Sequence, residues 1–228
     1  DVTATYLDFN ATRVGGVVGW ARLTNLYVTR SSYVGTVTGY QYVAGVAGQQ
    51  SLYSSVTDSY FRANLVTSTT TLNGGFVGST SNTTRLTRSY YAGTQSAVAA
   101  SRYGVAGSSS SGVTTCTNAF FDAGLLGSLL TSQSSGVCTG IGKTTTEMKT
   151  QSTFSGFDFT PGTGLWLMSS SMNDGYPFHA IPGGVPVDIT PPTATWTEPS
   201  SPRTSRTMSL LNEFGGAVRH DCRARCSM

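Results

Sequence analysis

Two aspartates come closest to a catalytic pair in this 228-residue chain. Asp58 directly precedes a Ser-Tyr dipeptide and Asp122 directly follows two phenylalanines, so both lie beside a similar aromatic landmark. A glycoside hydrolase needs two carboxyl groups within several ångströms of each other. These two fall two copies apart in an internal repeat, and stacking at the spacing of strands would keep them about 10 Å apart even if they were aligned. We therefore do not expect them to act as an acid–base pair.

Other groups suited to acid–base chemistry are scarce. Residues 1–140 contain only two further carboxylates in side chains, those of Asp1 and Asp8, and neither lysine nor histidine. His179 follows a Tyr-Pro-Phe phrase without the serine and aspartate pattern of a catalytic triad. We predict that the chain is not an enzyme. Parallel β-helices also carry polysaccharide lyases and hydrolases, so a carbohydrate-active enzyme is the alternative.

Metal ligands occur only in weak patterns. Asp158 and Asp174 have the chemistry for calcium together with loop carbonyls, but neither belongs to a D-x-D-x-D-G or G-G-x-G-x-D run. Cys222 and Cys226 form a C-x3-C pair near His220, which falls short of the four ligands of a zinc site. No metal or other cofactor is expected.

The remaining cysteines are a candidate disulfide. Cys116 and Cys138 are separated in the sequence by less than one copy of the repeat. That spacing allows them to sit on adjacent rungs, near enough for a bridge. Two buried free thiols are the alternative.

Aromatic side chains favour binding over catalysis. An exposed tyrosine combines an apolar ring with a polar tip and suits stacking on sugars. Threonine is frequent, as in residues 67–72, but it does not recur at one fixed position of every repeat, so a water-ordering threonine face is not expected. The tyrosines expected to be exposed for sugar binding are Tyr27, Tyr40, Tyr53 and Tyr103.

The glycine-rich stretch at residues 74–78 (GGFVG) raises the question of a phosphate-binding loop. It lacks the Lys-Ser/Thr ending of a P-loop and does not open a helix. Similar phrases start at positions 15, 44, 74 and 103, so the phrase recurs with a nearly constant period. Its glycines are therefore predicted to be structural, with positive φ at corners and close approach between copies. They are Gly15, Gly16, Gly19, Gly45, Gly48, Gly74, Gly75, Gly78, Gly104 and Gly107.

A second, aromatic landmark repeats in phase with the glycines. Tyr33 is aligned with Tyr60, Tyr90 and Phe120 because a serine or an alanine precedes each of them. Polar and apolar residues alternate between frequent glycines, which favours strands over helices. A unit this short buries its apolar side only when copies stack. The sequence predicts an all-β parallel β-solenoid (β-helix) of about five coils with a C-terminal capping segment.

The G-G-x-V-G phrase followed by S-Y-x-G, repeated at this nearly constant period, resembles the GLUG repeat of large bacterial surface and secreted proteins, many of them adhesin-like. Residues 140–182 resemble the unit that closes such arrays, and the resemblance covers roughly residues 1–182. It implies a solenoid outside the cell and supplies no catalytic residues. The matching positions of the closing unit are Lys143, Thr144, Glu147, Met148, Phe154, Gly156, Asp158, Phe159, Trp166, Tyr176 and Pro177.

Three parts are predicted along the chain: residues 1–140 form the solenoid, 141–182 cap it, and 183–228 follow. The cap begins with the only clear helix, at 143–150, where Glu147 is close to the capping-box spacing. Aromatic residues after it are expected to plug the last coil and cover its open edge. These are Phe154, Phe157, Phe159, Leu165, Trp166 and Phe178.

Residues 183–228 read as a proline-rich linker and the start of a strand. The phrase D-I-T-P-P-T-A-T-W resembles the opening of a bacterial immunoglobulin-like domain, which needs about 100 residues. The alternation is lost near residue 208, and the basic end is expected to be disordered or loosely packed and to differ from the native continuation.

Composition and charge narrow the possible partners. Residues 1–200 carry nine basic and nine acidic residues, so the net charge of +3 arises after residue 200, and no basic face for nucleic acid is expected. No apolar run is long enough for a transmembrane helix. With only 11% charged residues, the chain has the composition of an exported protein.

We predict a non-enzymatic module of a larger secreted or cell-surface adhesin-like protein, acting as a spacer or a binding face for carbohydrate or another cell-surface ligand. Ser79–Arg88, between the two landmarks, is the expected variable loop.

Overall fold

The computed structural model describes residues 2–3, 13–22, 25–67, 73–96, 102–109, 114–128 and 142–180, and every structural statement below concerns these residues. They belong to one compact unit, Val2–Ile189. The predicted linker, immunoglobulin-like start and tail at 183–228 lie outside the described residues. None of the described helices is long and apolar enough to cross a membrane.

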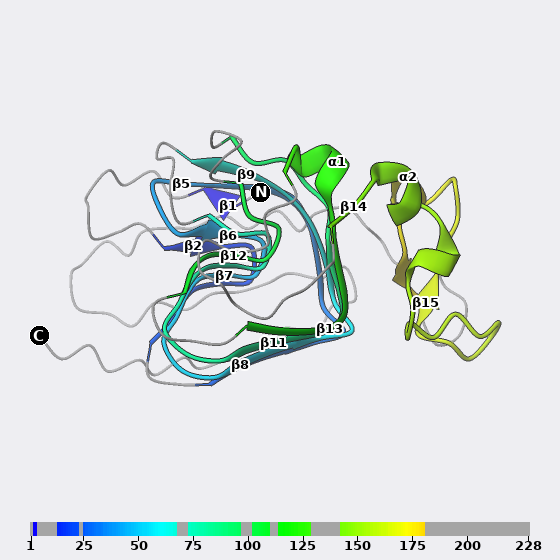
Figure 1. Ribbon diagram of the computed structural model, residues 1–228, viewed down its shortest axis with the longest axis horizontal. Helices are drawn as coiled ribbons and strands as arrows, with labels where there is room; N and C mark the ends of the chain where they lie inside the picture. The colour runs from blue at the N-terminus through cyan, green and yellow to red at the C-terminus, as the bar shows by residue number, and fades with distance from the viewer. Residues whose placement is uncertain are drawn as a thin grey trace, which may run out of the picture. The chain divides into compact units, whose positions relative to one another are not determined.

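The chain winds as a parallel β-solenoid with three strand positions in each turn (Figure 1). The first position is a four-stranded sheet of β3 (Val18–Ala21), β7 (Ala47–Gln50), β10 (Val77–Thr80) and β12 (Ala106–Ser109). The second is formed by β4 (Leu26–Thr29), β8 (Ser54–Thr57) and the first parts of β11 (Thr84–Tyr91) and β13 (Thr114–Asp122). The third is formed by β5 (Ser32–Gly39), β9 (Tyr60–Thr67) and the last parts of β11 and β13. Short strands complete the pairing: β1 (Val2–Thr3), β2 (Val14–Gly15), β6 (Val43–Ala44) and β14 (Gly142–Lys143).

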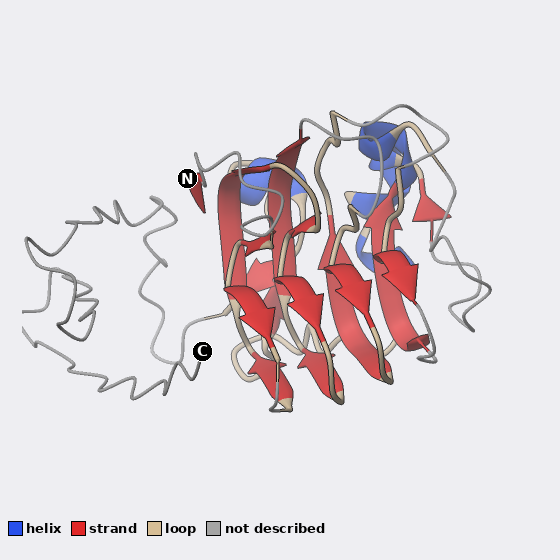
Figure 2. Ribbon diagram, turned by 90° about the vertical axis from the view of Figure 1, so that its left-hand side faces the viewer, coloured by secondary structure: helices blue, strands red, loops and turns tan. Residues whose placement is uncertain are grey.

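The predicted fold class is confirmed, and the repeat period reappears in the pairing register. Val18 pairs with Ala47, Ala47 with Val77, and Val77 with Ala106. These offsets equal those between the glycine phrases that start at positions 15, 44, 74 and 103. The described residues form about three turns, fewer than the expected five; Figure 2 shows the strands of successive turns stacked side by side. Ser79–Arg88 is also not a loop, since all of it except residues 81–83 lies in β10 and β11.

The aromatic landmark is shifted by one residue in the first coil. Ser32 pairs with Tyr60, and Tyr33 pairs with Phe61. Alternate strand residues face opposite sides, so a slip of one residue reverses every side chain. Tyr33 therefore belongs to the inward column, where an added Cβ at Gly16 would lie 2.9 Å from its ring. Its predicted alignment with Tyr60 was wrong.

A corner residue in the left-handed region joins the second and third strand positions in every coil. The φ angle is 47° at Arg30, 48° at Asp58, 42° at Arg88 and 51° at Asn118. The next residue in the first three coils is a serine whose hydroxyl closes the corner. Ser59 Oγ, for example, donates to the Thr57 carbonyl at 2.8 Å and accepts from the backbone N–H of Ser31 at 3.1 Å.

The repeated glycines do not have the positive φ predicted for them; their φ angles lie outside the left-handed region. Close approach explains these glycines, because an added Cβ would meet the backbone of a neighbouring coil or a ring of the same coil. A Cβ on Gly75 would lie 2.3 Å from the Gly104 carbonyl oxygen, and one on Gly104 would lie 2.2 Å from the Phe121 ring. Positions with no side chain, in the bends before β10 and β12, thus make room for the inward aromatic column.

The closing segment extends the last coil only through β14, which pairs with β13, and its rings cover the side of the solenoid. Its elements are α2 (Thr145–Met148), η2 (Gln151–Thr153), β15 (Trp166–Leu167), η3 (Asn173–Gly175) and β16 (Phe178–His179), and Figure 1 shows α2 and β15 beside the coil. Its rings pack on an outward column from three successive coils. Tyr60 contacts Trp166, Tyr90 contacts Phe154, and Phe120 contacts Phe157, with ring centroids 5.7–6.1 Å apart. These rings were expected to plug the open end of the last coil. That expectation was wrong, because they cover the outer side of three coils.

The predicted helix is present and a second one was missed. Thr144 caps α2 in a capping box with Glu147. The helix α1 (Ala123–Leu126) begins at the side chain of Asp122 and ends at Gly127, which has φ 66°. An Asp cap and a terminal glycine around Ala-Gly-Leu-Leu were its only sequence signal.

Candidate functional site

Asp58 is held as a structural carboxylate at its corner. Arg88 donates to it through Nε at 2.6 Å and Nη2 at 2.8 Å, and the Asp58 side chain is only 13% exposed. This bidentate pair raises the pKa of Arg88. His179 Nε2 lies 2.8 Å from the Asp58 carbonyl oxygen, so the corner also anchors the closing segment. Both oxygens of the Asp58 carboxylate therefore accept hydrogen bonds from Arg88 of the neighbouring coil.

Asp122 is the last residue of β13, where it is fully buried, and it also holds elements of the fold together. It accepts hydrogen bonds from the Tyr176 hydroxyl at 2.6 Å, Thr145 Oγ1 at 2.8 Å and the Leu125 N–H at 2.8 Å. Burial raises the pKa of Tyr176, so this hydroxyl keeps its proton. Asp122 joins the last coil to α1, to α2 and to the turn after η3. The two aspartates occupy different positions of the coil and do not form a catalytic pair.

His179 is enclosed by rings. Its centroid lies 4.6 Å from that of Trp166 and 5.1 Å from that of Tyr60. Burial lowers its pKa, which favours the neutral imidazole. These contacts describe a residue that holds the closing segment in place.

The two carboxylates that were considered for calcium, those of Asp158 and Asp174, also have other partners. Thr160 donates to Asp158 from its N–H at 3.0 Å and its hydroxyl at 2.6 Å, and these bonds lower the Asp158 pKa. Asp174 pairs with Arg62, which lowers its pKa as well. Among the described residues, no group of three or more His, Cys, Asp or Glu side chains could hold a metal ion.

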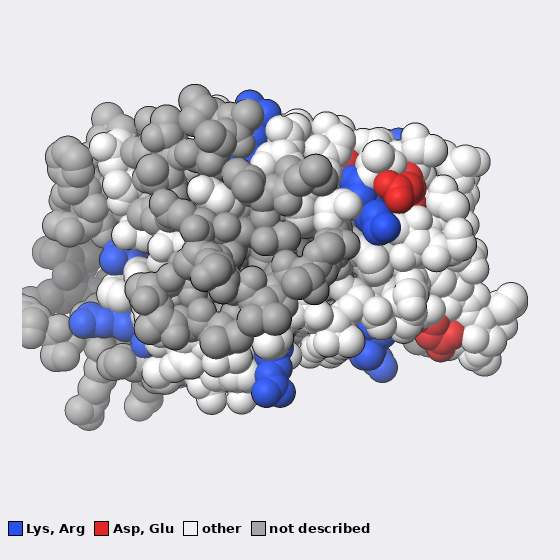
Figure 3. Space-filling view, in the orientation of Figure 1, with Lys and Arg blue, Asp and Glu red and all other residues white. Residues whose placement is uncertain are grey.

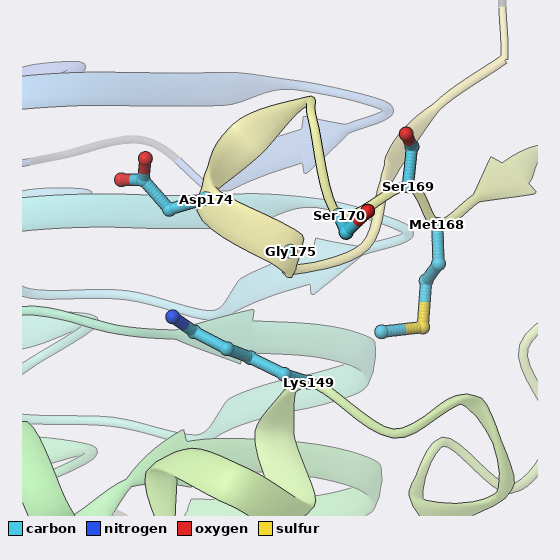
Figure 4. Close-up of a pocket in the computed structure, with 6 residues that line it drawn as sticks. All are labelled: Lys149, Met168, Ser169, Ser170, Asp174 and Gly175. Carbon is cyan, nitrogen blue, oxygen red and sulfur yellow. The ribbon is translucent and has the colours of Figure 1, made fainter.

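An open hollow of about 370 Å³ lies in the closing segment between Lys149 and Asp174. Figure 4 shows the Lys149 side chain running below the turn that carries Asp174 and Gly175. The Lys149 ammonium lies 5.1 Å from the centre of the Tyr176 ring, and Arg62 lies 5.0 Å from it. Arg62 and Asp174 therefore help to attach the closing segment to the coil, whereas the contact between Lys149 and Tyr176 lies within that segment.

Cys116 is disulfide-bonded. Its predicted partner, Cys138, lies outside the described residues, as do His220, Cys222 and Cys226.

The predicted sugar-binding tyrosines separate into two groups. Tyr27 is 67% exposed and its ring centroid lies 5.9 Å from that of Tyr53. Tyr40 is half-buried, and Tyr103 was wrongly expected at the surface, because it is only 8% exposed. The amide of Gln95 pairs with the Tyr103 backbone and holds it inside, donating to the carbonyl at 2.9 Å.

Tyr27 is exposed as predicted, whereas Tyr53 is half-buried, and both belong to a surface whose other members the sequence did not predict. Trp20, 40% exposed, lies 4.9 Å from the Arg22 guanidinium, and its indole N–H reaches Ser51 Oγ at 3.4 Å. The Arg85 guanidinium lies 5.7 Å from the centre of the Tyr53 ring. We call this surface the aromatic platform; it consists of Trp20, Arg22, Tyr27, Tyr53 and Arg85. The only sequence signal for Trp20 is a large ring in a column that continues as Gln49, Ser79 and Ser108.

A threonine row borders the platform and corrects the expectation that threonine has no fixed position. The register aligns Thr29, Thr57, Thr87 and Thr117, one from each coil. The neighbouring outward column is mixed and reads Tyr27, Ser55, Arg85 and Thr115. The surface therefore joins a regular row of hydroxyls to a column that contains a ring and a cation.

Comparison with protein-family models, with curated proteins and with solved structures finds no match for this chain. The resemblance to GLUG repeats rests on the residues quoted above and stays a prediction.

Proposed function

We propose that the chain is a non-enzymatic module of a secreted or cell-surface, adhesin-like protein, in which the coils act as a stiff spacer and present a binding face. The observation that carries the proposal is a division between buried and exposed groups. In the described coils the two carboxylates, Asp58 and Asp122, are buried and hydrogen-bonded, whereas the exposed groups include Trp20 and Tyr27.

Stiffness is supported by the way the closing segment is attached. It contacts Tyr60, Tyr90 and Phe120 on three successive coils, so that the coils cannot separate without losing buried aromatic area. A carbohydrate or another cell-surface ligand is the partner proposed for the exposed rings.

A glycan array probed with the labelled full chain tests the proposal, together with a turnover assay on the same glycans. We expect binding without release of reducing ends or unsaturated sugars. Sustained release of such products would overturn the non-enzymatic assignment in favour of a carbohydrate-active enzyme. Absence of binding to every glycan would remove the carbohydrate-binding part and leave the spacer.

A further inference from the structure

We propose that the aromatic platform binds an anionic polysaccharide, a sugar chain that carries carboxylate or sulfate groups. The proposal rests on the binding function proposed above and names the class of ligand. Tyr27, Tyr53 and Trp20 supply apolar rings for sugar faces. Arg22 and Arg85 lie next to two of these rings and supply donors for the anionic substituents.

Charge on the coils favours an anionic ligand. The described coil residues include seven arginines but only two acidic residues, Asp58 and Asp122, and both of these are buried. The acidic side chains visible in Figure 3 lie over the closing segment, away from the coil. The arginines are Arg13, Arg22, Arg30, Arg62, Arg85, Arg88 and Arg102. A polyanion on the coil surface would therefore meet arginines without an exposed carboxylate among the described coil residues.

The arrangement fits an extended chain. Tyr27, Ser55 and Arg85 occupy one outward column on three successive coils. At strand spacing the first and last Cα atoms lie about 10 Å apart. Beside them, the hydroxyls of Thr29, Thr57 and Thr87 line the same strands and suit hydrogen bonds to sugar hydroxyls. A single surface thus offers a ring, hydroxyls and a cation in sequence.

Nucleic acid is the competing polyanion. Its binding draws on many phosphate contacts, and affinity falls steeply with salt as they are lost. Only Arg22, Arg30 and Arg85 are exposed among the described coil arginines. Three cations with hydroxyl-rich surroundings favour a sugar chain over a phosphate backbone.

The test measures binding of the full chain to alginate, dextran sulfate, neutral dextran and single-stranded DNA at physiological salt. We expect alginate or dextran sulfate to bind at least tenfold more tightly than dextran and DNA. Tyr53→Ala, Tyr27→Ala and Arg85→Gln should each weaken that binding by about fivefold to tenfold. Tyr53→Phe keeps the ring and should keep the affinity. Lys149→Gln removes one positive charge from the closing segment and is the charge-matched control.

Each result decides between the proposals. Binding of any glycan that survives Tyr27→Ala, Tyr53→Ala and Arg85→Gln overturns the platform and leaves the general binding function intact. Equal affinity for dextran overturns the anionic specificity, and tighter binding of DNA overturns the ligand class. Absence of binding to all four probes also overturns this inference, while binding of another glycan on the array would keep the proposed function. Because Tyr27 is largely exposed, we expect the Tyr27→Ala variant to stay folded, so weaker binding would report the lost contact. Thermal melting of each variant is the control for folding.

Discussion

Tyr60 and Tyr90 stack on adjacent coils, with ring centroids 5.4 Å apart and ring planes 8° from parallel. They face outward, and the closing segment packs over them. Asn173 Nδ2 donates to the Tyr90 hydroxyl at 2.9 Å, and that hydroxyl donates to the Pro177 carbonyl. The pair therefore links the repeating coils to the part of the chain that does not repeat.

Replacing Tyr90 should test this link. Its side chain is fully buried, so Tyr90→Ala should lower the free energy of unfolding by about 3–5 kcal/mol. Tyr90→Phe removes only the hydroxyl and should cost about 1–2 kcal/mol. Urea denaturation measures both values, with Tyr27→Ala as the exposed control, expected to change stability by less than about 0.5 kcal/mol. A cost for Tyr90→Ala no larger than that of the control would contradict the lateral packing.

The ion pair at the second corner should be measurable. Asp58→Ala leaves Arg88 without its bidentate partner and should cost about 2 kcal/mol. Asp58→Asn keeps a residue that tolerates positive φ and should cost less. A double-mutant cycle with Arg88→Ala should give a coupling of about 1 kcal/mol. Additive single costs would show that the two side chains do not interact.

Stability should fall in mild acid because of His179. Its pKa in the folded chain is below the ordinary 6.5, since burial disfavours the cation. The unfolded chain therefore binds more protons below about pH 6.5, and stability decreases as the pH falls from there towards the folded-state pKa. Denaturation between pH 8 and pH 5 measures the slope. His179→Gln should flatten it, and an unchanged slope in that variant would assign the effect to another group.

Close approach between coils predicts the response of the repeat glycines. A Cβ on Gly75 meets the Gly104 carbonyl oxygen and the Tyr91 ring, 2.3 and 2.5 Å away. Gly75→Ala should cost about 3 kcal/mol. At Gly162, φ is 81° and nothing lies within 4 Å, so alanine there should cost only the strain of the left-handed region, about 1–2 kcal/mol. Equal costs in thermal or urea unfolding would mean that steric contact is not what selects glycine at 75.

The repeat period could be predicted from the sequence because each coil must place apolar residues over those of its neighbour. Which aromatic residues point into the solenoid and which point outward could not be predicted from the sequence. A double serine, Ser31-Ser32, precedes Tyr33, so matching by residue type aligned it with Tyr60 in place of Phe61. The register follows from the corner at Arg30, and a non-glycine residue at positive φ leaves little trace in a sequence.

The candidate site was predicted only in part. Tyr27 and Tyr53 were identified by residue type, since exposed tyrosines suit sugars. Arg85 could not be assigned, because its place near Tyr53 depends on the register between strands that lie one full coil apart in the sequence. Tyr103 was misplaced because its burial depends on the hydrogen bonds of Gln95, which sequence periodicity does not reveal.

The central claim is that the coils bind through their surface and catalyse nothing. Incubation of the full chain with alginate and dextran sulfate, followed by affinity measurement and product analysis on the same samples, tests it most directly. We expect binding that is weakened about fivefold to tenfold in Tyr53→Ala and retained in Tyr53→Phe, with the polysaccharide chains intact. Shortened chains produced by the wild type and not by Asp58→Asn or Asp122→Asn would contradict it, because they would make these buried carboxylates catalytic.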